Sequence, residues 1–153
     1  MLIVGAGIVG AACAREFARQ GLSVAVIEPG AIGGGATAAA MGHLLVTDDA
    51  EFALSRRSLQ LWDQWLDEHP AHAEQAEHQR CGTLWIAADE EELALAEAKR
   101  AGYAQQGLAA ELIDAAGLAR LEPLLRPGLA GALRVPGDAR VYPPKVAARW
   151  LAE

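Results

Sequence analysis

The sequence predicts an α/β fold, because its first 28 residues alternate strand and helix patterns around a glycine turn. Residues 1–4 form an apolar run, the turn reads Gly5-Ala6-Gly7-Ile8-Val9-Gly10, and a helical pattern continues to residue 19. A second apolar run over residues 22–27 is followed directly by Glu28. In this order of strand, glycine turn, helix, strand and acid, a G-x-G-x-x-G motif predicts a Rossmann-like βαβ unit that binds an adenine dinucleotide.

Each residue type in this motif has a physical role. Gly5 permits a tight turn out of the strand, Gly7 lets a pyrophosphate approach the backbone, and Gly10 lets the helix pack closely on the sheet. The helix N-terminus offers free N–H groups and the positive end of its dipole to phosphates. Glu28 can accept both hydroxyls of an adenosine ribose, and it disfavours the 2′-phosphate of NADP. The motif alone does not separate FAD from NAD, and a βαβ unit without a ligand is the simpler structural alternative.

The composition is typical of a globular protein with a hydrophobic core. Of its 153 residues, 52% are hydrophobic and 22% are charged, and the net charge of −7 disfavours nucleic acid and anionic membrane surfaces as partners. We expect no transmembrane segment, because no apolar run reaches about 18 residues, and no signal peptide, because no basic segment precedes the first apolar run. Two cysteines form no disulfide framework, so a cytoplasmic location is expected, with Cys13 buried in the first helix.

Residues 29–43 form a segment rich in glycine and alanine. One interpretation is a flexible linker, but linkers are usually polar, whereas here Thr37 is the lone hydroxyl residue among apolar ones. The alternative, which we favour, is a loop whose backbone lies against a flat ligand beside the nucleotide site.

A long amphipathic helix is predicted from residue 52, with Asp48 or Asp49 as its N-cap. Its apolar residues recur at helical spacing at Phe52, Leu59, Trp62 and Leu66. For Trp62 and Trp65, packing in the core is the favoured interpretation over stacking on a cofactor.

A metal site is not expected, although four potential ligands lie close together in the sequence. His69, His72, His78 and Cys81 match no compact zinc spacing, and the residues between them are typical of a solvated helix.

Near residue 80 the sequence changes from a helical pattern to a strand pattern. It predicts strands over residues 82–88, 110–113 and 129–135, helices from Asp89 to 106 and from Asp114 to 121, and a last helix over 145–153. Asp89 and Asp114 are suited to be N-caps. The sequence stops inside this last helix, so we expect the chain to be the N-terminal portion of a longer protein.

The sequence resembles the FAD-dependent D-amino-acid oxidase superfamily, in the branch of glycine oxidase, sarcosine oxidase and D-amino-acid dehydrogenases. The resemblance is carried by the dinucleotide motif and by residues 34–44, 82–86, 121–123 and 136–143, in that order, and it covers essentially the whole chain. Within the family, Met41-Gly42-His43 followed by Thr47-Asp48-Asp49 is most similar to flavin subunits of opine oxidase or D-hydroxyproline dehydrogenase.

The resemblance implies a set of FAD contacts along the first 43 residues. It puts the pyrophosphate at the glycine turn, the ribose at the end of the second strand, the middle of FAD at the small-residue segment and the isoalloxazine ring after it. The corresponding residues are, in that order, Ile8 and Val9, then Glu28 and Pro29, then Ala36 and Thr37, and finally Met41, Gly42 and His43. His43 replaces an apolar residue of glycine oxidases, so it either hydrogen-bonds and tunes the flavin or simply fills space.

The resemblance further implies an FAD domain over residues 1–80, part of an α+β substrate domain over 81–140, and a helix returning to the FAD domain over 141–153. The implied activity is oxidation of the C–N bond of a small amine or amino acid (a D-amino acid, glycine, sarcosine, hydroxyproline or opine) to an imine, with hydride transfer to FAD. Oxygen, a quinone or a partner subunit would accept the electrons. The resemblance is compatible both with partner subunits and with a homo-oligomer. Catalytic residues remain unassigned, because the family binds the substrate carboxylate through residues beyond this sequence.

Two alternatives stay open. An NAD-dependent dehydrogenase shares the glycine motif but needs another βαβ unit after Glu28, which residues 29–68 do not supply. A truncated, non-catalytic nucleotide-binding fragment is the other.

Overall fold

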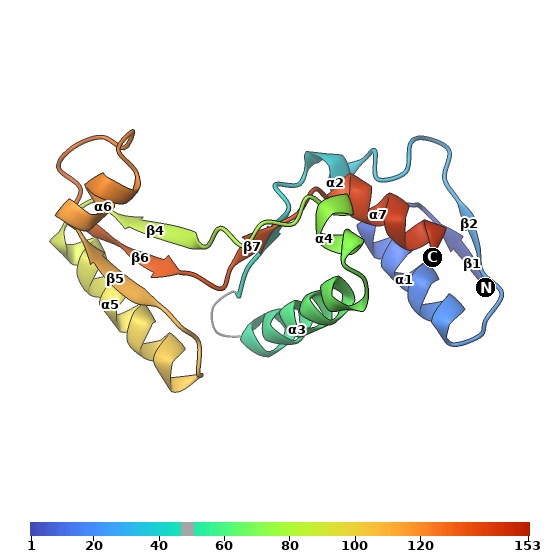
Figure 1. Cartoon of the computed structure of the whole chain (residues 1–153), viewed down its shortest axis with the longest axis horizontal. Coiled ribbons are helices and arrows are strands. Elements are labelled where there is room, and N and C mark those ends of the chain that lie inside the picture. The colour runs from blue at the N-terminus through green and yellow to red at the C-terminus, as the bar shows by residue number, and fades with distance from the viewer. Residues whose placement is uncertain (47–50) are drawn as a thin grey trace. The chain divides into compact units, whose positions relative to one another are not determined.

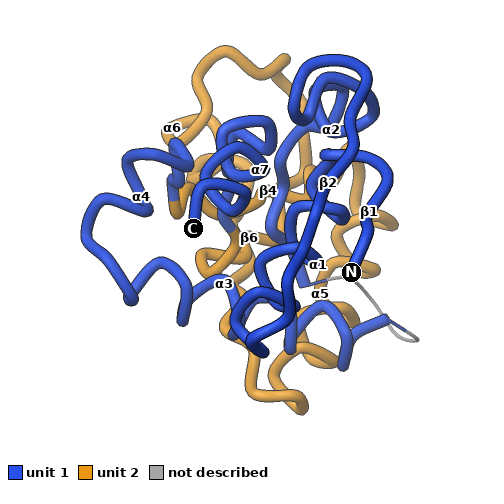
Figure 2. Tube along the Cα trace, turned by 90° about the vertical axis from the view of Figure 1, so that its right-hand side faces the viewer, with its two compact units in different colours: residues 1–79, 139–153 blue, residues 80–138 orange. Residues whose placement is uncertain are grey.

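The computed structural model describes residues 1–46 and 51–153, which form two compact units. The first unit comprises residues 1–79 and 139–153, and the second comprises residues 80–138 (Figure 2). The predicted N-cap at Asp48 or Asp49 lies outside the described residues.

The first unit begins with the predicted βαβ arrangement. Strand β1 (Leu2–Val4) leads through the glycine turn to helix α1 (Ile8–Arg19), and strand β2 (Ala25–Ile27) then pairs in parallel with β1 (Figure 1). The register joins Leu2 to Ala25 and Val4 to Ile27. The later elements of this unit are α2 (Ala36–Ala39), β3 (His43–Leu44), α3 (Phe52–Glu68), α4 (Ala71–Gln75), β7 (Ala139–Arg140) and α7 (Pro143–Ala152).

The second unit is a three-stranded antiparallel sheet with two helices. Its strands are in the order β4-β6-β5, and its elements along the chain are β4 (Thr83–Ala87), α5 (Glu90–Gln105), β5 (Glu111–Asp114), α6 (Ala115–Leu121) and β6 (Gly131–Val135). The predicted N-caps are confirmed, because the Asp89 carboxylate accepts the Glu92 N–H at 2.9 Å and the Asp114 carboxylate accepts the Gly117 N–H at 2.6 Å. The centre of β6 is buried at Leu133, which is 0% exposed.

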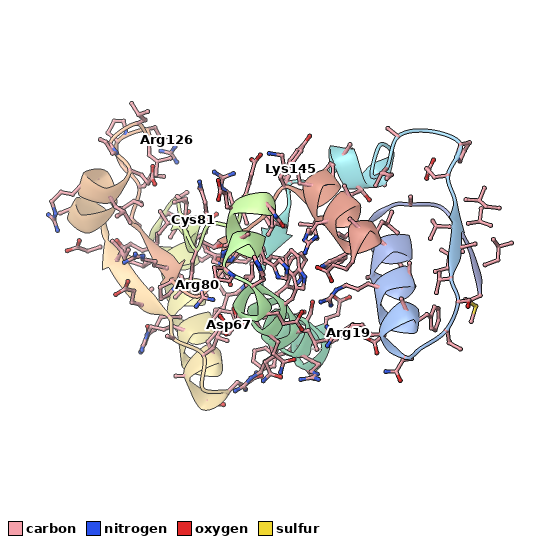
Figure 3. All side chains as sticks on the ribbon, turned by 45° about the vertical axis from the view of Figure 1, so that its right-hand side comes forward. Arg19, Asp67, Arg80, Cys81, Arg126 and Lys145 are labelled. Carbon is pink, nitrogen blue, oxygen red and sulfur yellow. The ribbon has the colours of Figure 1, made fainter. Side chains whose placement is uncertain are left out.

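Small residues on α1 allow close packing against α7. Ala11 and Ala14 are buried on α1, and α1 and α7 are in contact along their lengths (Figure 1). The expectation that Cys13 is buried is wrong: its side chain is exposed, because it lies on the same helical face as Val9, which is 74% exposed. Cys81 is also a free, exposed cysteine (Figure 3).

The core of the first unit is built around tryptophans, as the sequence predicted. Trp65 is 2% exposed, and its ring centroid lies 5.7 Å from that of Trp62 and 5.5 Å from that of Trp150. His72 stacks on Trp65 at 4.4 Å, with an interplanar angle of 13°. These contacts join α3, α4 and α7 into one core, in which Val146 is 0% exposed.

Three short elements were not predicted. The glycine- and alanine-rich segment forms one helical turn, α2, consistent with the high helix propensity of its alanines. Strands β3 and β7 pair antiparallel, with His43 opposite Arg140. Two-residue strands depend on a partner distant in sequence, so no local pattern indicates them.

Within the described ranges, the helices are all too short or too polar to cross a membrane.

Candidate functional site

The turn between β1 and α1 has the geometry that its glycines predict. Gly5 has a φ of +102°, a left-handed conformation that favours glycine, and its N–H donates to the Ile27 carbonyl at 2.8 Å. A Cβ on Gly10 would lie 2.1 Å from the Gly5 carbonyl oxygen. The absence of a side chain at Gly10 therefore lets the first turn of α1 rest directly on the end of β1.

The N-terminus of α1 is met by a hydroxyl from α2. Gly7 is the N-cap residue of α1 and contributes no side-chain cap, but the Ile8 N–H donates to Thr37 Oγ1 at 3.0 Å. Thr37 is 7% exposed, so its hydroxyl is held at this position by its surroundings. Because the oxygen accepts from Ile8, the hydroxyl hydrogen remains able to donate to an anion at the same helix end.

Gly7 is close to the same hydroxyl. A Cβ at Gly7 would lie 3.1 Å from Thr37 Oγ1, which is tighter than an ordinary contact. The glycine is therefore required by the neighbouring threonine as well as by any phosphate that approaches the backbone. The sequence motif indicated only the second reason.

Glu28 follows β2 and turns back to the glycine turn. One carboxylate oxygen accepts the Ala6 N–H at 2.9 Å, and the other accepts the Gly30 N–H at 2.9 Å. These two hydrogen bonds lower the pKa of the Glu28 carboxyl from its usual value, so the group is ionised at neutral pH. A carboxylate has about four acceptor positions, so Glu28 retains room for two ribose hydroxyls.

A cavity of about 660 Å³ lies along β1 and the first turns of α1. This volume is in the range of small-molecule sites, about 300–1,000 Å³. It brings together more than half of the predicted site residues, namely Gly5, Gly7, Ile8, Val9, Gly10, Ala36 and Thr37. Glu28, Pro29, Met41, Gly42 and His43 do not line it.

The residues predicted to contact the flavin are Met41 and Gly42, which directly precede β3, and His43, which begins it. Met41 is 79% exposed and His43 is exposed, whereas Gly42 has a φ of +74° and is pressed against the backbone of residue 141. Sequence reasoning missed the backbone supports of the site, the Ala6 N–H and the buried Gly33. The run of three glycines at 33–35 was a signal that one of them adopts a left-handed conformation, and Gly33 does so at φ +65°.

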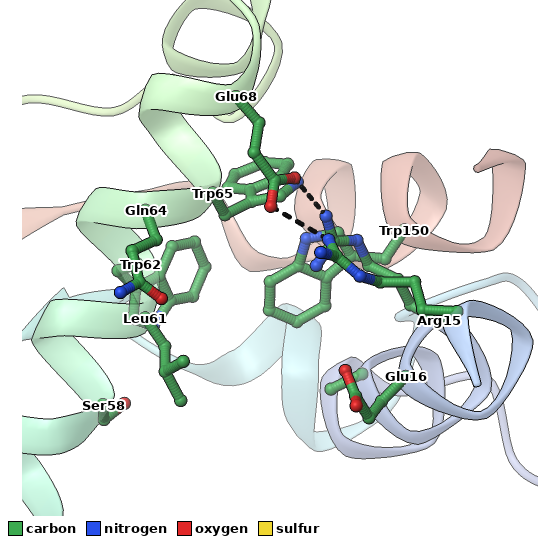
Figure 4. Close-up of a pocket in the computed structure, with 11 residues that line it drawn as sticks. Arg15, Glu16, Ser58, Leu61, Trp62, Gln64, Trp65, Glu68 and Trp150 are labelled. Atoms are coloured by element: carbon green, nitrogen blue, oxygen red, sulfur yellow. Dashed lines mark hydrogen bonds and ion pairs between the residues drawn. The ribbon is translucent and has the colours of Figure 1, made fainter.

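A second cavity, of about 520 Å³, lies between α1 and α3 and is drawn in Figure 4. It is bordered by Trp62 and Trp150 and by Glu68, which pairs with Arg15 at 2.6 Å and with Arg19 at 2.9 Å. None of the predicted site residues lines this cavity, so we do not assign the cofactor to it.

Two of the four histidines, His69 and His72, have local roles in the fold. His72 is 3% exposed, and its Nδ1 lies 2.6 Å from the Trp65 carbonyl oxygen, while His69 Nδ1 accepts the Ala71 N–H at 3.1 Å. Among residues 1–46 and 51–153, no three His, Cys, Asp or Glu side chains are grouped as metal ligands.

Comparison with known proteins relates all 153 residues to one family. The family model described as "FAD dependent oxidoreductase" (DAO) matches residues 1–153. The chain is 32% identical to glycine oxidase of Geobacillus kaustophilus (strain HTA426), over 95% of this chain and 41% of that protein. It is 30% identical to a subunit of the anaerobic glycerol-3-phosphate dehydrogenase of Escherichia coli (strain K12), over 94% of this chain and 26% of that protein.

Among solved structures, iminodiacetate oxidase from Chelativorans sp. BNC1 is similar, with a TM-score of 0.79 and 31% identity, over 99% of this chain and 43% of that one. The chain therefore spans less than half the length of each of these three relatives.

Proposed function

The chain belongs to the FAD-dependent oxidoreductase (DAO) family, and from that membership we propose that its first unit holds the adenosine and pyrophosphate portion of FAD at the N-terminus of α1. The observation that carries this proposal is the convergence of two side chains on the glycine turn. They are the Thr37 hydroxyl, 3.0 Å from the Ile8 nitrogen, and the Glu28 carboxylate, 2.9 Å from the Ala6 nitrogen.

The residues fit the chemistry of that group. The positive end of α1 and the Thr37 hydroxyl hydrogen suit a pyrophosphate, and the ionised Glu28 carboxylate suits the two hydroxyls of a ribose. Backbone glycines at the turn leave the approach to the helix end free of side chains. By the same proposal, Pro29 lies by the ribose, Ala36 by the middle of FAD, and residues 41–43 by the isoalloxazine ring.

We further propose that the whole protein oxidises a small amine or amino acid. When bound, FAD supplies the two-electron oxidation in which the substrate loses a hydride from the carbon of its C–N bond and a proton from nitrogen, leaving an imine. Two of the three relatives described above are named for amine substrates, glycine and iminodiacetate, and the third is named for glycerol-3-phosphate, so we favour a C–N over a C–O bond as the target. The FAD domain is assigned to the first unit, and the substrate domain to the second.

Flavin retention tests the cofactor proposal. Purified protein is mixed with FAD, desalted, and examined for flavin absorbance at about 450 nm. We expect wild type to retain the band and Gly7→Val to lose it, because the valine side chain displaces the Thr37 hydroxyl and fills the approach to the turn. Gly137→Val is the matched control, because Gly137 lies in the second unit and a Cβ there would meet no atom within 4 Å. Equal retention by all three proteins would contradict the assignment.

Anaerobic bleaching of the same band tests the substrate class in the whole protein. We expect bleaching with one or more of glycine, sarcosine, D-amino acids, hydroxyproline, opines and iminodiacetate. Bleaching by glycerol-3-phosphate alone would instead indicate C–O oxidation and would overturn the amine proposal.

A further inference from the structure

The loop that carries the proposed FAD contacts rests on a segment from the far end of the chain. We call residues 141–144, which follow β7 and open α7, the return segment. The Val141 N–H donates to the Gly42 carbonyl at 2.9 Å, so the return segment is hydrogen-bonded to the end of the loop. Strand β7 pairs with β3 immediately beside it, which extends the contact to residues 43 and 44.

Two glycines are the points of closest approach. A Cβ on Gly42 would lie 2.0 Å from the Val141 carbonyl oxygen, and a Cβ on Gly33 would lie 2.9 Å from Pro144 Cα. Both glycines have positive φ values, +74° and +65°. The loop is therefore held at both ends by backbone contacts that tolerate no side chain.

Gly33 also connects the return segment to the phosphate site. Its N–H donates to the Ala6 carbonyl at 2.9 Å, within the glycine turn. A Cβ on Gly33 would also lie 3.4 Å from Thr37 Cγ2. Gly33 is thus hydrogen-bonded to the turn, and the space in which its side chain would lie is already occupied by Thr37 and Pro144.

From these contacts we propose that the return segment is a positioning element for the cofactor loop, and that Gly33 is the positioning residue through which it places the Thr37 hydroxyl at the N-terminus of α1. This proposal rests on the proposed FAD site, which it deepens. A side chain at Gly33 has to push away from Pro144 Cα, a backbone atom that cannot rotate aside, so the displacement is directed into α2 and moves Thr37.

The test is a double-mutant cycle on FAD affinity in the whole protein. Thr37→Val is expected to weaken FAD binding by about 10- to 100-fold, the range for losing one hydrogen bond to a charged group. Gly33→Ala is expected to cause a loss of similar size. The double variant is expected to lose no more than the larger single loss, because both substitutions remove the same contact.

Gly137→Ala is the matched control. Gly137 lies in the second unit, outside the cofactor loop, and its Cβ would meet no atom within 4 Å, so affinity should change by less than about threefold. Additive losses in the double variant, or wild-type affinity in Gly33→Ala, would overturn the positioning role.

Hydrogen exchange of the Ile8 amide separates this proposal from the cofactor proposal. The amide should be protected in wild type and Gly137→Ala, and it should exchange faster in Thr37→Val and Gly33→Ala, with or without FAD. If wild type binds no FAD, the cofactor proposal fails while the exchange pattern still reports on positioning. If the Ile8 amide of Gly33→Ala stays protected, the positioning proposal fails even where FAD binds.

Discussion

Gly10→Ala changes the stability of the fold through two effects of opposite sign, helix propensity and a steric clash. Gly10 lies inside α1, where alanine is favoured over glycine by about 1 kcal/mol on intrinsic helix propensity. In this structure, however, the added Cβ would lie 2.1 Å from the Gly5 carbonyl oxygen and 3.5 Å from Ile3 Cγ2. The obstructing atom belongs to the backbone, so relief requires α1 to move away from β1.

The magnitude follows from the two terms. Forcing an extra methyl group into a close-packed contact costs about 1–3 kcal/mol, and a backbone obstruction belongs at the upper end of that range. After the propensity gain is subtracted, we expect Gly10→Ala to lower the free energy of unfolding by about 2 kcal/mol.

Gly102→Ala is the matched control for this experiment. Gly102 lies in α5, and its Cβ would meet no atom within 4 Å, so the same substitution should raise the free energy of unfolding by about 0.4–1 kcal/mol. Urea unfolding followed by far-UV circular dichroism measures both variants. If Gly10→Ala were as stable as wild type or more so, the close approach of helix and strand would not be the reason for the glycine.

Three further predictions concern the core, a helix cap and pH. Trp65→Ala should lower the free energy of unfolding by about 3–5 kcal/mol in urea titrations, whereas Leu124→Ala, at a side chain that is 99% exposed, should change it by less than about 0.5 kcal/mol. Asp89→Ala should lower the free energy of unfolding by about 0.5–2 kcal/mol, because α5 loses its N-cap. Asp89→Asn should keep most of the wild-type stability; an equal loss in both variants would contradict the cap role. The pKa of Glu28 is lower in the folded protein than its usual value of 4.5, so its contribution to stability is present above that pH and is lost as pH falls through the folded pKa. Glu28→Gln should therefore differ most from wild type in unfolding free energy above pH 4.5, and the difference should shrink below it; a gap independent of pH would refute this.

Local patterns were sufficient wherever one residue acts on its near neighbours. Asp89 and Asp114 were identified as caps from the helical runs that follow them, and both accept the expected backbone N–H. The apolar spacing of α3 predicted a packed tryptophan, and Trp65 is 2% exposed. Periodicity failed for Cys13, because a helical face rich in apolar residues does not itself say which neighbouring element covers it.

The sequence by itself determined the βαβ unit, the positions of its glycines and the acid after the second strand, because each depends on backbone conformation or on periodicity within a few residues. The tertiary structure alone decided how the site is assembled. The Glu28 carboxylate reaches a partner 22 residues away and the Thr37 hydroxyl one 29 residues away, and Gly33 and Gly42 rest on a segment that follows the entire second unit. Such contacts form only when distant segments pack together, so their distances and the glycines they require are properties of the folded chain and not of any local pattern.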